Sequence, residues 1–343
     1  MTTEPTLLVT GGAGYIGSHV VLALLAAGRR VVVLDDLSTG DERLLAPGIE
    51  AFHHVDVGDV AAVRHILEDH DIGTVLHFAG AIINMASIVD PIGYYARNTG
   101  ATLGLLQAME ATGRRRIVFS STAAVYGDAA LQPVPETAPV EPLAPYGASK
   151  AMVERILTDA QKAGKLEAVC LRYFNVAGAD EAGRSGQLGG PPTHLIRLAL
   201  EVAVGRREIL EIFGTDFPTP DGTTIRDYIH VSDLADAHLA AVDYLEAGRC
   251  AGEKPSFFNC GYGEGLSVLD VIEEVRRVSG HPMPTRKAPA RDGDAPRLIC
   301  DSRRAREILG WQPRIGGQGS RAALEVMIRS ALAWQSRMAP VEQ

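Results

Sequence analysis

The sequence contains little cysteine, no excess of basic residues and no long apolar run. Its four cysteines, at 170, 250, 260 and 300, form no C-x-x-C pair and no tight cluster, which argues against a disulfide framework and a zinc site. A net charge of −9 argues against nucleic acid or an anionic membrane as the main partner. No stretch approaches about 18 apolar residues, and the first residues show no basic start of a secretory signal. We therefore expect a cytoplasmic protein without a metal site or a membrane partner.

The length of 343 residues exceeds the size at which one hydrophobic core keeps growing, so a large domain with a smaller one is expected. In the first half, short β-branched runs alternate with segments of helical period. The expected strands and helices alternate over residues 7–10, 16–27, 31–34, 60–70, 74–78, 91–111, 116–120, 146–163 and 167–172. This alternation predicts an α/β fold with a doubly wound parallel sheet of the Rossmann type.

The second half is less regular, with loops expected at 178–192 and 214–224. The expected elements there are helices at 195–205, 231–247, 268–279, 302–309 and 319–337 and a strand at 256–259. The pattern predicts a larger domain over residues 1–175, which residues 225–260 rejoin. The remaining segments, 176–224 and 261–343, are predicted to form a smaller C-terminal α/β lobe.

Three glycines, Gly11, Gly14 and Gly17, follow the first expected strand with the spacing G-x-x-G-x-x-G. Glycine permits a tight turn and lets backbone N–H groups approach a pyrophosphate, which then lies at a helix N-terminus. A plain turn is the alternative, but the position between a strand and a helix near the chain start favours a dinucleotide site.

Acidic residues occur where the second expected strand ends. Asp35 and Asp36 stand roughly 20 residues past the glycines, as a carboxylate that binds the adenosine ribose would. A carboxylate there repels a 2′-phosphate, which favours NAD over NADP. The alternative is that both acids merely end a strand in a polar turn. Asp56 and the Phe-Ala-Gly turn at 78–80 follow further strand ends, where ligands of open α/β sheets bind.

Tyr146 and Lys150 stand four residues apart and so share one face of an expected helix. A phenol with a pKa near 10 is a poor base at neutral pH, and a nearby ammonium is expected to lower that pKa. A surface pair on an amphipathic helix is the alternative for an isolated Y-x-x-x-K. The hydroxyl cluster at 120–122, which includes Thr122 and ends the preceding strand, favours a reactive site. A dinucleotide beside an activated tyrosine predicts hydride and proton transfer between an alcohol and a ketone.

In this order and spacing, the motifs resemble the extended short-chain dehydrogenase/reductase family. More narrowly, they are similar to the UDP-glucose 4-epimerases, over nearly the whole chain to about residue 310. The motifs that carry this similarity are TGGAGYIGS at 10–18, LDDLSTG at 34–40, HFAG at 77–80, SSTAAVYG at 120–127, RYFN at 172–175 and RDYIHV at 226–231. The last two are more specific to the epimerase branch.

The resemblance implies an isomerase that inverts C4 of a UDP-hexose by transient oxidation to a 4-keto sugar with bound NAD. It implies catalytic roles for Tyr146, Lys150 and Thr122. The implied cofactor-binding residues are Gly11, Gly14, Tyr15, Ile16, Gly17, Asp35, Asp36, Leu37, Ser38, Thr39, Gly40, Asp56, Val57, Phe78, Ala79, Gly80, Asn98, Ser120, Tyr146, Lys150 and Tyr173. The implied substrate-binding residues are Thr122, Tyr146, Asn175, His194, Leu195, Phe213, Arg226, Arg291, Asp294 and Leu298.

The family resemblance also implies a homodimer formed by the helices at 91–111 and 146–163. Leu103, Leu106, Met109 and Met152 fit an exposed helical interface, although core packing explains them nearly as well. Asp227 and His230 are interpreted as structural residues that link the lobes.

Three positions depart from the family pattern. Ile82 stands where many members carry lysine, so a phosphate contact from that position is not expected. His194 replaces a common asparagine near the substrate phosphates, and a plain polar residue at a helix start is an equal alternative. Leu298 aligns with a gate position, where tyrosine is associated with glucose and galactose only and a small residue with N-acetylated sugars. Leucine is intermediate and leaves the sugar range open.

Other functions remain as alternatives. Another UDP-sugar 4-epimerase, for N-acetylhexosamine, uronate or pentose, and a net NAD-dependent oxidoreductase would share these motifs. A 4,6-dehydratase is disfavoured, because Ala123 and Ala124 follow Thr122 where such enzymes carry Asp-Glu. A non-enzymatic redox sensor is disfavoured, because such proteins typically lose the tyrosine or the lysine.

Overall fold

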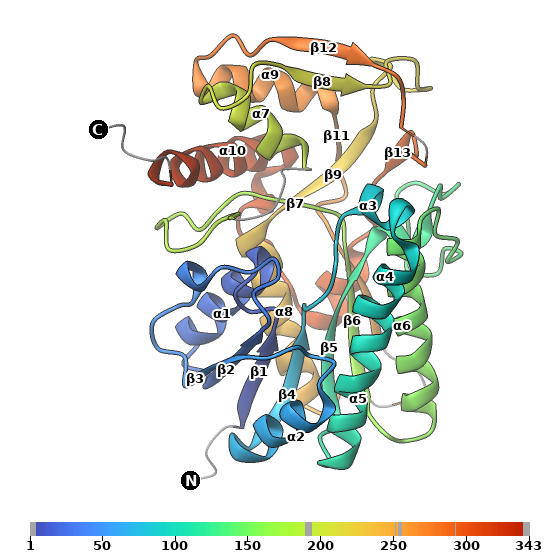
Figure 1. The fold of residues 1–343 in the computed structure, drawn as a ribbon. Coiled ribbons are helices and arrows are strands. Elements are labelled where there is room, and N and C mark those ends of the chain that lie inside the picture. Colours follow the sequence, from blue (N-terminus) through green and yellow to red (C-terminus); the bar gives the residue numbers. More distant parts are fainter. Residues whose placement is uncertain (1–4, 189–193, 251, 253–255, 292, 339–343) are drawn as a thin grey trace.

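A seven-stranded parallel sheet forms the larger part of the molecule (Figure 1). The structure is a computed structural model, and it describes residues 5–188, 194–250, 252, 256–291 and 293–338. The strand order is β10-β6-β5-β4-β1-β2-β3, and every neighbouring pair is parallel. The strands are β1 (Thr6–Thr10), β2 (Val31–Asp35), β3 (Ala51–His54), β4 (Ile72–His77), β5 (Arg116–Thr122), β6 (Glu167–Tyr173) and β10 (Ser256–Cys260). The predicted doubly wound α/β fold is confirmed.

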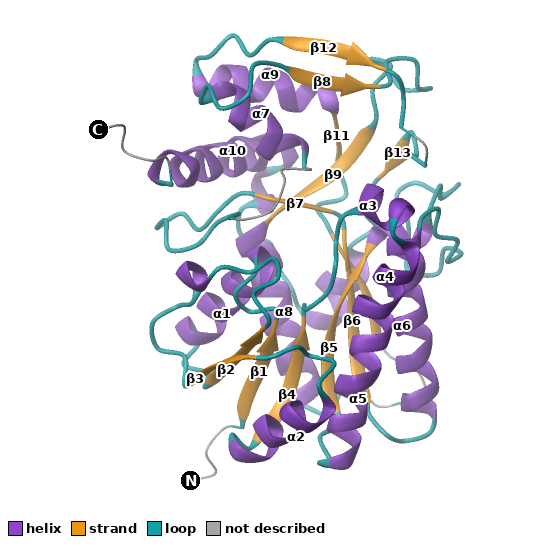
Figure 2. Ribbon diagram, in the orientation of Figure 1, coloured by secondary structure: helices purple, strands orange, loops and turns teal. Residues whose placement is uncertain are grey.

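Helices cover both faces of this sheet (Figure 2). The helices α1 (Tyr15–Ala26) and α8 (Val231–Glu246) pack together on one face, and α2 (Val60–Asp69), α5 (Ala101–Ala111) and α6 (Pro145–Lys162) cover the other. Two hydrophobic clusters result, one around Val20 and Leu234 and the other around Leu105 and Val153. Because both faces are covered, β1 and β2 are buried along their whole length, which explains their continuous apolar sequences.

The helix expected at 91–111 is interrupted. It consists of α4 (Pro91–Tyr95), a π-helical turn over Ala96–Gly100 and then α5, and the short helix α3 (Asn84–Val89) precedes it. The π-helical turn contains Asn98, which is buried. Such π turns are frequent at functional sites. Periodicity alone does not show one, because the extra residue shifts the register within an otherwise helical segment.

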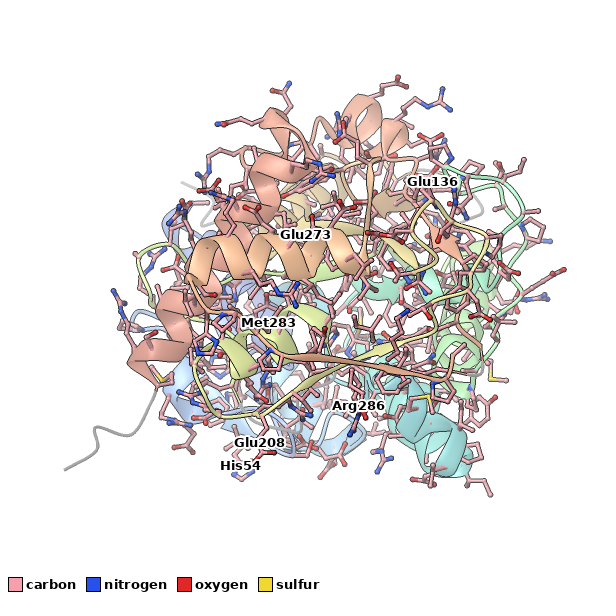
Figure 3. All side chains as sticks on the ribbon, turned by 90° about the horizontal axis from the view of Figure 1, so that it is seen from above. His54, Glu136, Glu208, Glu273, Met283 and Arg286 are labelled. Atoms are coloured by element: carbon pink, nitrogen blue, oxygen red, sulfur yellow. The ribbon has the colours of Figure 1, made fainter. Side chains whose placement is uncertain are left out.

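The smaller lobe lies beyond the carboxyl ends of the large sheet (Figure 1). One sheet contains β7 (Asn175–Ala177), β9 (Ile225–His230), β11 (Gly265–Ser267) and β13 (Arg297–Leu298), and a second pairs β8 (Leu210–Phe213) with β12 (Thr285–Ala288). The lobe's helices are α7 (Leu195–Ala203), α9 (Val268–Ser279) and α10 (Ser320–Arg337). Seen from above, α9 with Glu273 and β12 with Arg286 lie in front of the larger domain (Figure 3).

The partners of β9, α8 and β10 indicate where the chain passes from the lobe back to the larger domain. β10 joins the large sheet and α8 packs on α1, whereas β9 pairs within the lobe. We therefore propose that the chain returns to the larger domain at Val231. The strands β7, β8, β9, β11, β12 and β13 had not been predicted, because they are short and of mixed polarity. The helix expected at 302–309 contains a π-helical turn over Ala305–Leu309.

Two of the four apolar residues expected on exposed helix faces are exposed. Leu103 and Met152 have 42% and 47% of their surface exposed. For Met109 the alternative of core packing holds, because it is 2% exposed and packs in the core with Leu105, and Leu106 is half-buried against the same cluster. The helical period places Met109 on the sheet side of α5.

Asp227 and His230 make internal contacts. Asp227 accepts hydrogen bonds from the backbone N–H groups of Tyr262, Gly263 and Cys300 at 2.9, 2.8 and 3.1 Å. His230 accepts one from the N–H of Ser232 at 3.1 Å. Both residues therefore act within the protein framework, as the sequence indicated.

Candidate active site

The glycine-rich turn between β1 and α1 is packed too closely for side chains. Gly11 has φ of 71°, and a Cβ there would lie 2.7 Å from the backbone nitrogen of Ala79. A Cβ on Gly17 would collide with the carbonyl oxygen of Gly11. Gly14 is the N-cap of α1 and has no side chain that could cap the first turn. The turn thus presents backbone N–H groups at the N-terminus of a helix, which is the arrangement that binds a pyrophosphate.

Asp35, at the end of β2, holds this turn in place. Its carboxylate accepts hydrogen bonds of 2.9 Å from the backbone N–H groups of Ala13 and Leu37. Burial raises the pKa of Asp35, although these two hydrogen bonds oppose that effect. Its neighbour Asp36 is exposed and accepts from the N–H and hydroxyl of Ser38. Asp35 therefore joins the glycine turn to the segment 37–40, which the resemblance assigned to the cofactor.

Further residues assigned to the cofactor lie on the same edge of the sheet. Asp56 follows β3 and accepts a hydrogen bond of 2.7 Å from the N–H of Gly58, while Val57 is buried. Phe78, Ala79 and Gly80 follow β4 directly. These residues, the glycine turn and Asp35 all follow carboxyl ends of parallel strands, which is where a dinucleotide binds in such sheets.

Asn98 connects the loop after β4 to the start of α6. Its Oδ1 accepts from the N–H of Ala81 at 2.7 Å, and its Nδ2 donates to the carbonyl of Ala81 at 3.0 Å and to Oγ of Ser149 at 2.9 Å. Ser149 in turn donates to the carbonyl of Tyr146 at 2.7 Å. The π turn thereby braces the first turn of the helix that carries the tyrosine. Ser149 was missed from the sequence, because its side chain acts only through this fold-dependent contact.

Tyr146 and Lys150 share the inner face of α6, as their spacing predicted. The Lys150 ammonium donates a hydrogen bond of 3.0 Å to the carbonyl oxygen of Ser120 and lies 4.9 Å from the centre of the Phe119 ring. Burial lowers the pKa of Lys150 to about 8. The lysine is therefore fixed to β5, at the strand end that also carries Thr122.

The expectation that Lys150 makes the phenol acidic is wrong for the protein by itself. Burial raises the pKa of Tyr146 to about 12, and the group that lowers it is the hydroxyl of Thr122 through a side-chain hydrogen bond. The ammonium of Lys150 is turned to the backbone of Ser120 instead. The tyrosine is thus a proton donor at neutral pH until another positive charge approaches it.

Ser120 and Tyr173 lie beneath these groups. The Tyr173 hydroxyl donates a hydrogen bond to Oγ of Ser120. The ring of Tyr173 packs 5.7 Å from that of His238, which lies 4.8 Å from the ring of Phe78. An aromatic layer therefore supports the predicted cofactor-facing residues of β4, β5 and β6.

The residues assigned to the substrate lie across the strands of the lobe. Asn175 in β7 and Leu298 in β13 flank β9, and Leu298 pairs with Arg226. Leu298 also packs against a hydrophobic cluster that includes Ala123, the residue that follows Thr122. The lobe sheet thus carries the predicted gate residue to the reactive end of β5.

Two arginines, Arg226 and Arg291, each lie close to another residue that was assigned to the substrate. The guanidinium of Arg226 lies 3.6 Å from the Asp294 carboxylate, and burial lowers the pKa of this arginine. The guanidinium of Arg291 lies 3.7 Å from the centre of the Phe213 ring, at the end of the β8–β12 pair. A guanidinium offers a planar fork of donors with a positive charge, which suits an anionic ligand.

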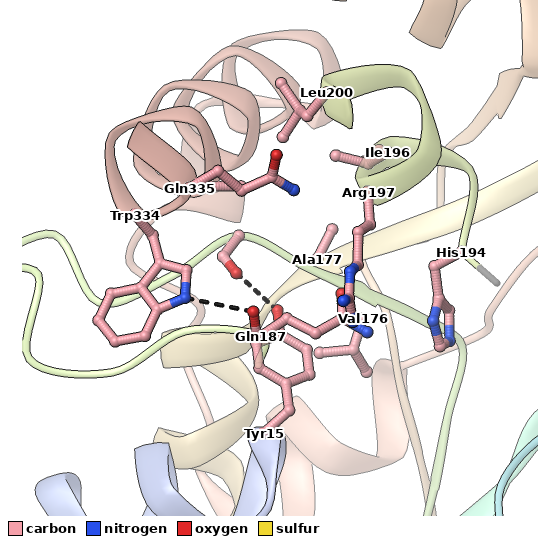
Figure 4. Close-up of a pocket in the computed structure, with 12 residues that line it drawn as sticks. Tyr15, Val176, Ala177, Gln187, His194, Ile196, Arg197, Leu200, Trp334 and Gln335 are labelled. Atoms are coloured by element: carbon pink, nitrogen blue, oxygen red, sulfur yellow. Dashed lines mark hydrogen bonds between the residues drawn. The ribbon is translucent and has the colours of Figure 1, made fainter. Parts of the chain in front are cut away.

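His194 begins α7 as its N-cap, makes no side-chain capping bond and is exposed. It lines a pocket with Tyr15 and Arg197, as Figure 4 shows. The Tyr15 hydroxyl donates to the carbonyl of Gly178 at 2.7 Å and so ties α1 to the lobe. Leu195 packs against the lobe core. Arg197, one turn after His194, was not singled out from the sequence because an arginine on an amphipathic helix carries no distinctive signal.

Within the described ranges, no group of three or more His, Cys, Asp or Glu side chains is placed to hold a metal ion. The four cysteines are buried and unpaired. Over the same part of the chain, no helix has the length and apolar character needed to cross a bilayer.

The fold and this site define a dinucleotide-dependent enzyme with a Y-x-x-x-K helix. Residues 7–261 match the model of the NAD dependent epimerase/dehydratase family, and the chain belongs to that family. It is 48% identical to a UDP-glucose 4-epimerase of Azospirillum brasilense, over 97% of this chain and 92% of that protein.

Solved structures agree with this assignment. A UDP-glucose-4-epimerase from Stenotrophomonas maltophila, with bound NAD and formylated UDP-arabinopyranose, is similar with a TM-score of 0.91 and 37% identity over 98% of this chain and 99% of that one. A UDP-Glc/GlcNAc 4-epimerase from Campylobacter jejuni is similar with a TM-score of 0.82 and 40% identity over 97% and 100%.

Proposed function

We propose that this protein reversibly inverts C4 of a UDP-hexose, interconverting UDP-glucose and UDP-galactose with NAD that stays bound. The observation that carries the proposal is the meeting of Thr122, Tyr146 and Lys150 beside a glycine turn built for a pyrophosphate. The near full-length similarity to UDP-glucose 4-epimerases supports it.

The residues of the glycine turn, with Asp35 and the segment 37–40, suit the dinucleotide, because close packing leaves room there for backbone contacts only. When bound, NAD supplies a hydride acceptor and donor for the sugar C4 and, in its oxidised form, a positively charged ring. Asp35 gives the adenosine end a carboxylate, which favours NAD over NADP.

Tyr146 takes the proton from the sugar 4-hydroxyl and later returns it to the oxygen of the 4-keto sugar. Its pKa of about 12 makes it a poor base alone, so an added positive charge is required to bring that pKa toward neutrality. The Thr122 hydroxyl lowers that pKa. Lys150, fixed on Ser120, keeps a cation on the same helix face. Because the hydride removed from C4 would return to the same carbon on its other face, the reaction would need no added reductant.

The lobe residues hold the uridine diphosphate in this proposal. Arg226 and Arg291 bind the diphosphate, and Asp294 binds the uridine ribose. Phe213 stacks on the base with the ring face opposite to Arg291, because the guanidinium of Arg291 covers the other face. Asn175, His194 and Leu195 complete this side of the cleft.

A wider sugar range is a second candidate. Leu298 packs against the cluster that includes Ala123 and is smaller than tyrosine, which supports entry of N-acetylated sugars at the gate. The similarity to a UDP-Glc/GlcNAc 4-epimerase supports the same extension.

We also propose that the chain forms a homodimer in the cytoplasm. Exposed apolar side chains gather on α3 to α6, including Val89 and Ile92 with 86% and 81% of their surface exposed, besides Leu103 and Met152. Such a patch favours a protein interface. Analytical ultracentrifugation of the wild type and of Leu103→Lys/Met152→Glu tests it: a dimer that becomes a monomer supports the proposal, and a wild-type monomer contradicts it.

The cytoplasmic location is supported by the unpaired cysteines, which are typical of a reducing compartment.

The function is tested by incubating the purified protein with UDP-galactose without added reductant, then with a panel of UDP-sugars. We expect UDP-glucose to form. Tyr146→Phe is expected to lower kcat about 1,000-fold, since positioned acid–base catalysis contributes about 10²- to 10⁴-fold, while bound NAD is retained. Tyr244→Phe, which alters a hydroxyl on α8 near Ser256, is the matched control and should be fully active. Strict dependence on stoichiometric NADH or NADPH would instead indicate a reductase.

A further inference from the structure

A pair of buried charges, Glu154 in α6 and Arg172 in β6, lies behind the reacting groups. Their side chains are 5% and 4% exposed. Nε and Nη2 of Arg172 donate to Oε1 and Oε2 of Glu154 at 2.8 and 2.6 Å. The guanidinium also lies between two rings, 5.0 Å from the centre of Tyr126 and 4.6 Å from that of Phe257. A bidentate pair of this kind fixes orientation as well as distance.

Further hydrogen bonds join the pair to three adjacent strands. Ser121 in β5 donates to Oε1 of Glu154 at 2.6 Å. Nη1 of Arg172 donates to the Tyr126 hydroxyl at 2.9 Å, and that hydroxyl donates to Oδ1 of Asn259 in β10 at 2.7 Å. The network thereby fastens one face of α6 to β5, β6 and β10, which are neighbours in the sheet.

The pair is also close in sequence to each reacting group. On α6, Glu154 follows Lys150 by one helical turn and Tyr146 by two, so all three project to the same side. On β5, Ser121 directly precedes Thr122. A displacement of Glu154 along the sheet would therefore move the tyrosine relative to the threonine.

We infer that Glu154 and Arg172 are positioning residues, which set where α6 lies along β5 and so keep the Tyr146 phenol within reach of Thr122. This inference rests on the proposed function, because it concerns the geometry of that reaction. Packing alone does not require the charges: replacing a buried ion pair with apolar residues of similar volume is often neutral or stabilising. Catalysis depends more strongly on the position of the reacting groups than packing does, because a displacement of about 1 Å can lower the rate about 100-fold.

The test is the double variant Glu154→Leu/Arg172→Met, which removes both charges and leaves no unpaired one. We expect a folded protein with the wild-type circular dichroism spectrum and bound NAD. Its kcat with UDP-galactose should fall about 100-fold while KM changes less than about threefold, because the loss concerns the chemical step. A merely structural pair would change the melting temperature and leave kcat unchanged.

A matched control pair lies elsewhere in the larger domain. Arg29 donates to both carboxylate oxygens of Glu246 at 2.6 and 2.8 Å, with 7% and 21% of the side chains exposed. This pair joins the start of β2 to the end of α8. The variant Arg29→Met/Glu246→Leu should keep the wild-type kcat.

A folded Glu154→Leu/Arg172→Met protein with the wild-type kcat would overturn the inference. If that variant does not fold, the variant Ser121→Ala tests the inference in its place. This substitution removes only the hydroxyl that donates a hydrogen bond from β5 to Glu154. We expect it to lower kcat about tenfold with KM and melting temperature little changed, and an unchanged kcat would overturn the inference. Absence of epimerisation by the wild type would reject the proposed function itself, whereas an active wild type with an unaffected variant rejects only the positioning role.

Discussion

The Lys150 ammonium donates its hydrogen bond to the backbone carbonyl oxygen of Ser120, 3.0 Å away, and not to the phenol of Tyr146 one helical turn before it. This contact places a buried cation at the end of β5, the strand end that also carries Thr122, and the Thr122 hydroxyl lowers the pKa of Tyr146. The buried lysine predicts an effect on the stability of the protein, and the effect of Thr122 on the pKa of Tyr146 predicts an effect on the pH dependence of catalysis.

Lys150→Met is expected to stabilise the protein freed of dinucleotide. Burial lowers the pKa of Lys150 from 10.5 to about 8, so the folded state disfavours the charged form. The cost is fully present below pH 8 and disappears as the pH rises through 10.5, because the unfolded state then also loses its proton. At pH 7 the free energy of unfolding should rise by about 3 kcal/mol at most, since one pKa unit is worth about 1.4 kcal/mol.

Urea unfolding of Lys150→Met and wild type at a series of pH values provides the measurement. The advantage of the variant should shrink between pH 8 and 10.5. Lys162→Met, which replaces an exposed lysine at the end of the same helix, is the control for the loss of one positive charge. A variant less stable than the wild type at pH 7 would mean that the bond to Ser120 outweighs the cost of burial.

Thr122→Val should shift the pH dependence of kcat to higher pH. The Thr122 hydroxyl lowers the pKa of Tyr146 against the effect of burial, so its removal raises that pKa. A base is active only above its pKa, and the rising limb of the profile therefore moves upward. Activity lost at pH 7 should be partly recovered at alkaline pH. An equal loss at every pH would show that Thr122 acts on the substrate and not on the tyrosine.

Asp35→Asn should weaken NAD binding and reduce the preference for NAD over NADP. The substitution keeps the size of the side chain but removes the charge that repels a 2′-phosphate. Because a hydrogen bond to a charged group is worth about 1.5–3 kcal/mol, we expect the ratio of the two affinities to fall at least about tenfold. Isothermal titration calorimetry with both dinucleotides measures this ratio. Unchanged affinities for both dinucleotides would show that Asp35 does not contribute to cofactor binding.

Leu298→Tyr should reduce turnover of UDP-N-acetylglucosamine more than that of UDP-galactose. Leu298 in β13 packs against the hydrophobic cluster that includes Ala123, the neighbour of Thr122, so we expect a larger ring there to narrow the space for the sugar. Comparing kcat/KM for the two sugars in the variant and in Leu298→Ile, a change of similar volume, measures the effect. Equal ratios in all proteins would place the selectivity at another residue.

The large sheet could be predicted because its signals are local. The continuous apolar run at 31–34, the glycines of the first turn and Asp35 each follow from rules about neighbouring residues. The Y-x-x-x-K spacing likewise places two side chains on one helix face without further information. The lobe was less predictable, because strands such as β7 and β13 are only three and two residues long and exist through their pairing with β9.

The sequence by itself determined the order of the strands and helices of the larger domain, the phosphate turn and the pairing of a tyrosine with a lysine on one helix. Only the tertiary structure decided which way the lysine points, how acidic the phenol is, and that Glu154 meets Arg172 in the interior. Hydrogen-bond direction and burial depend on groups from distant segments, such as the carbonyl of Ser120 and the side chain of Arg172. Those groups come together only when the chain has folded.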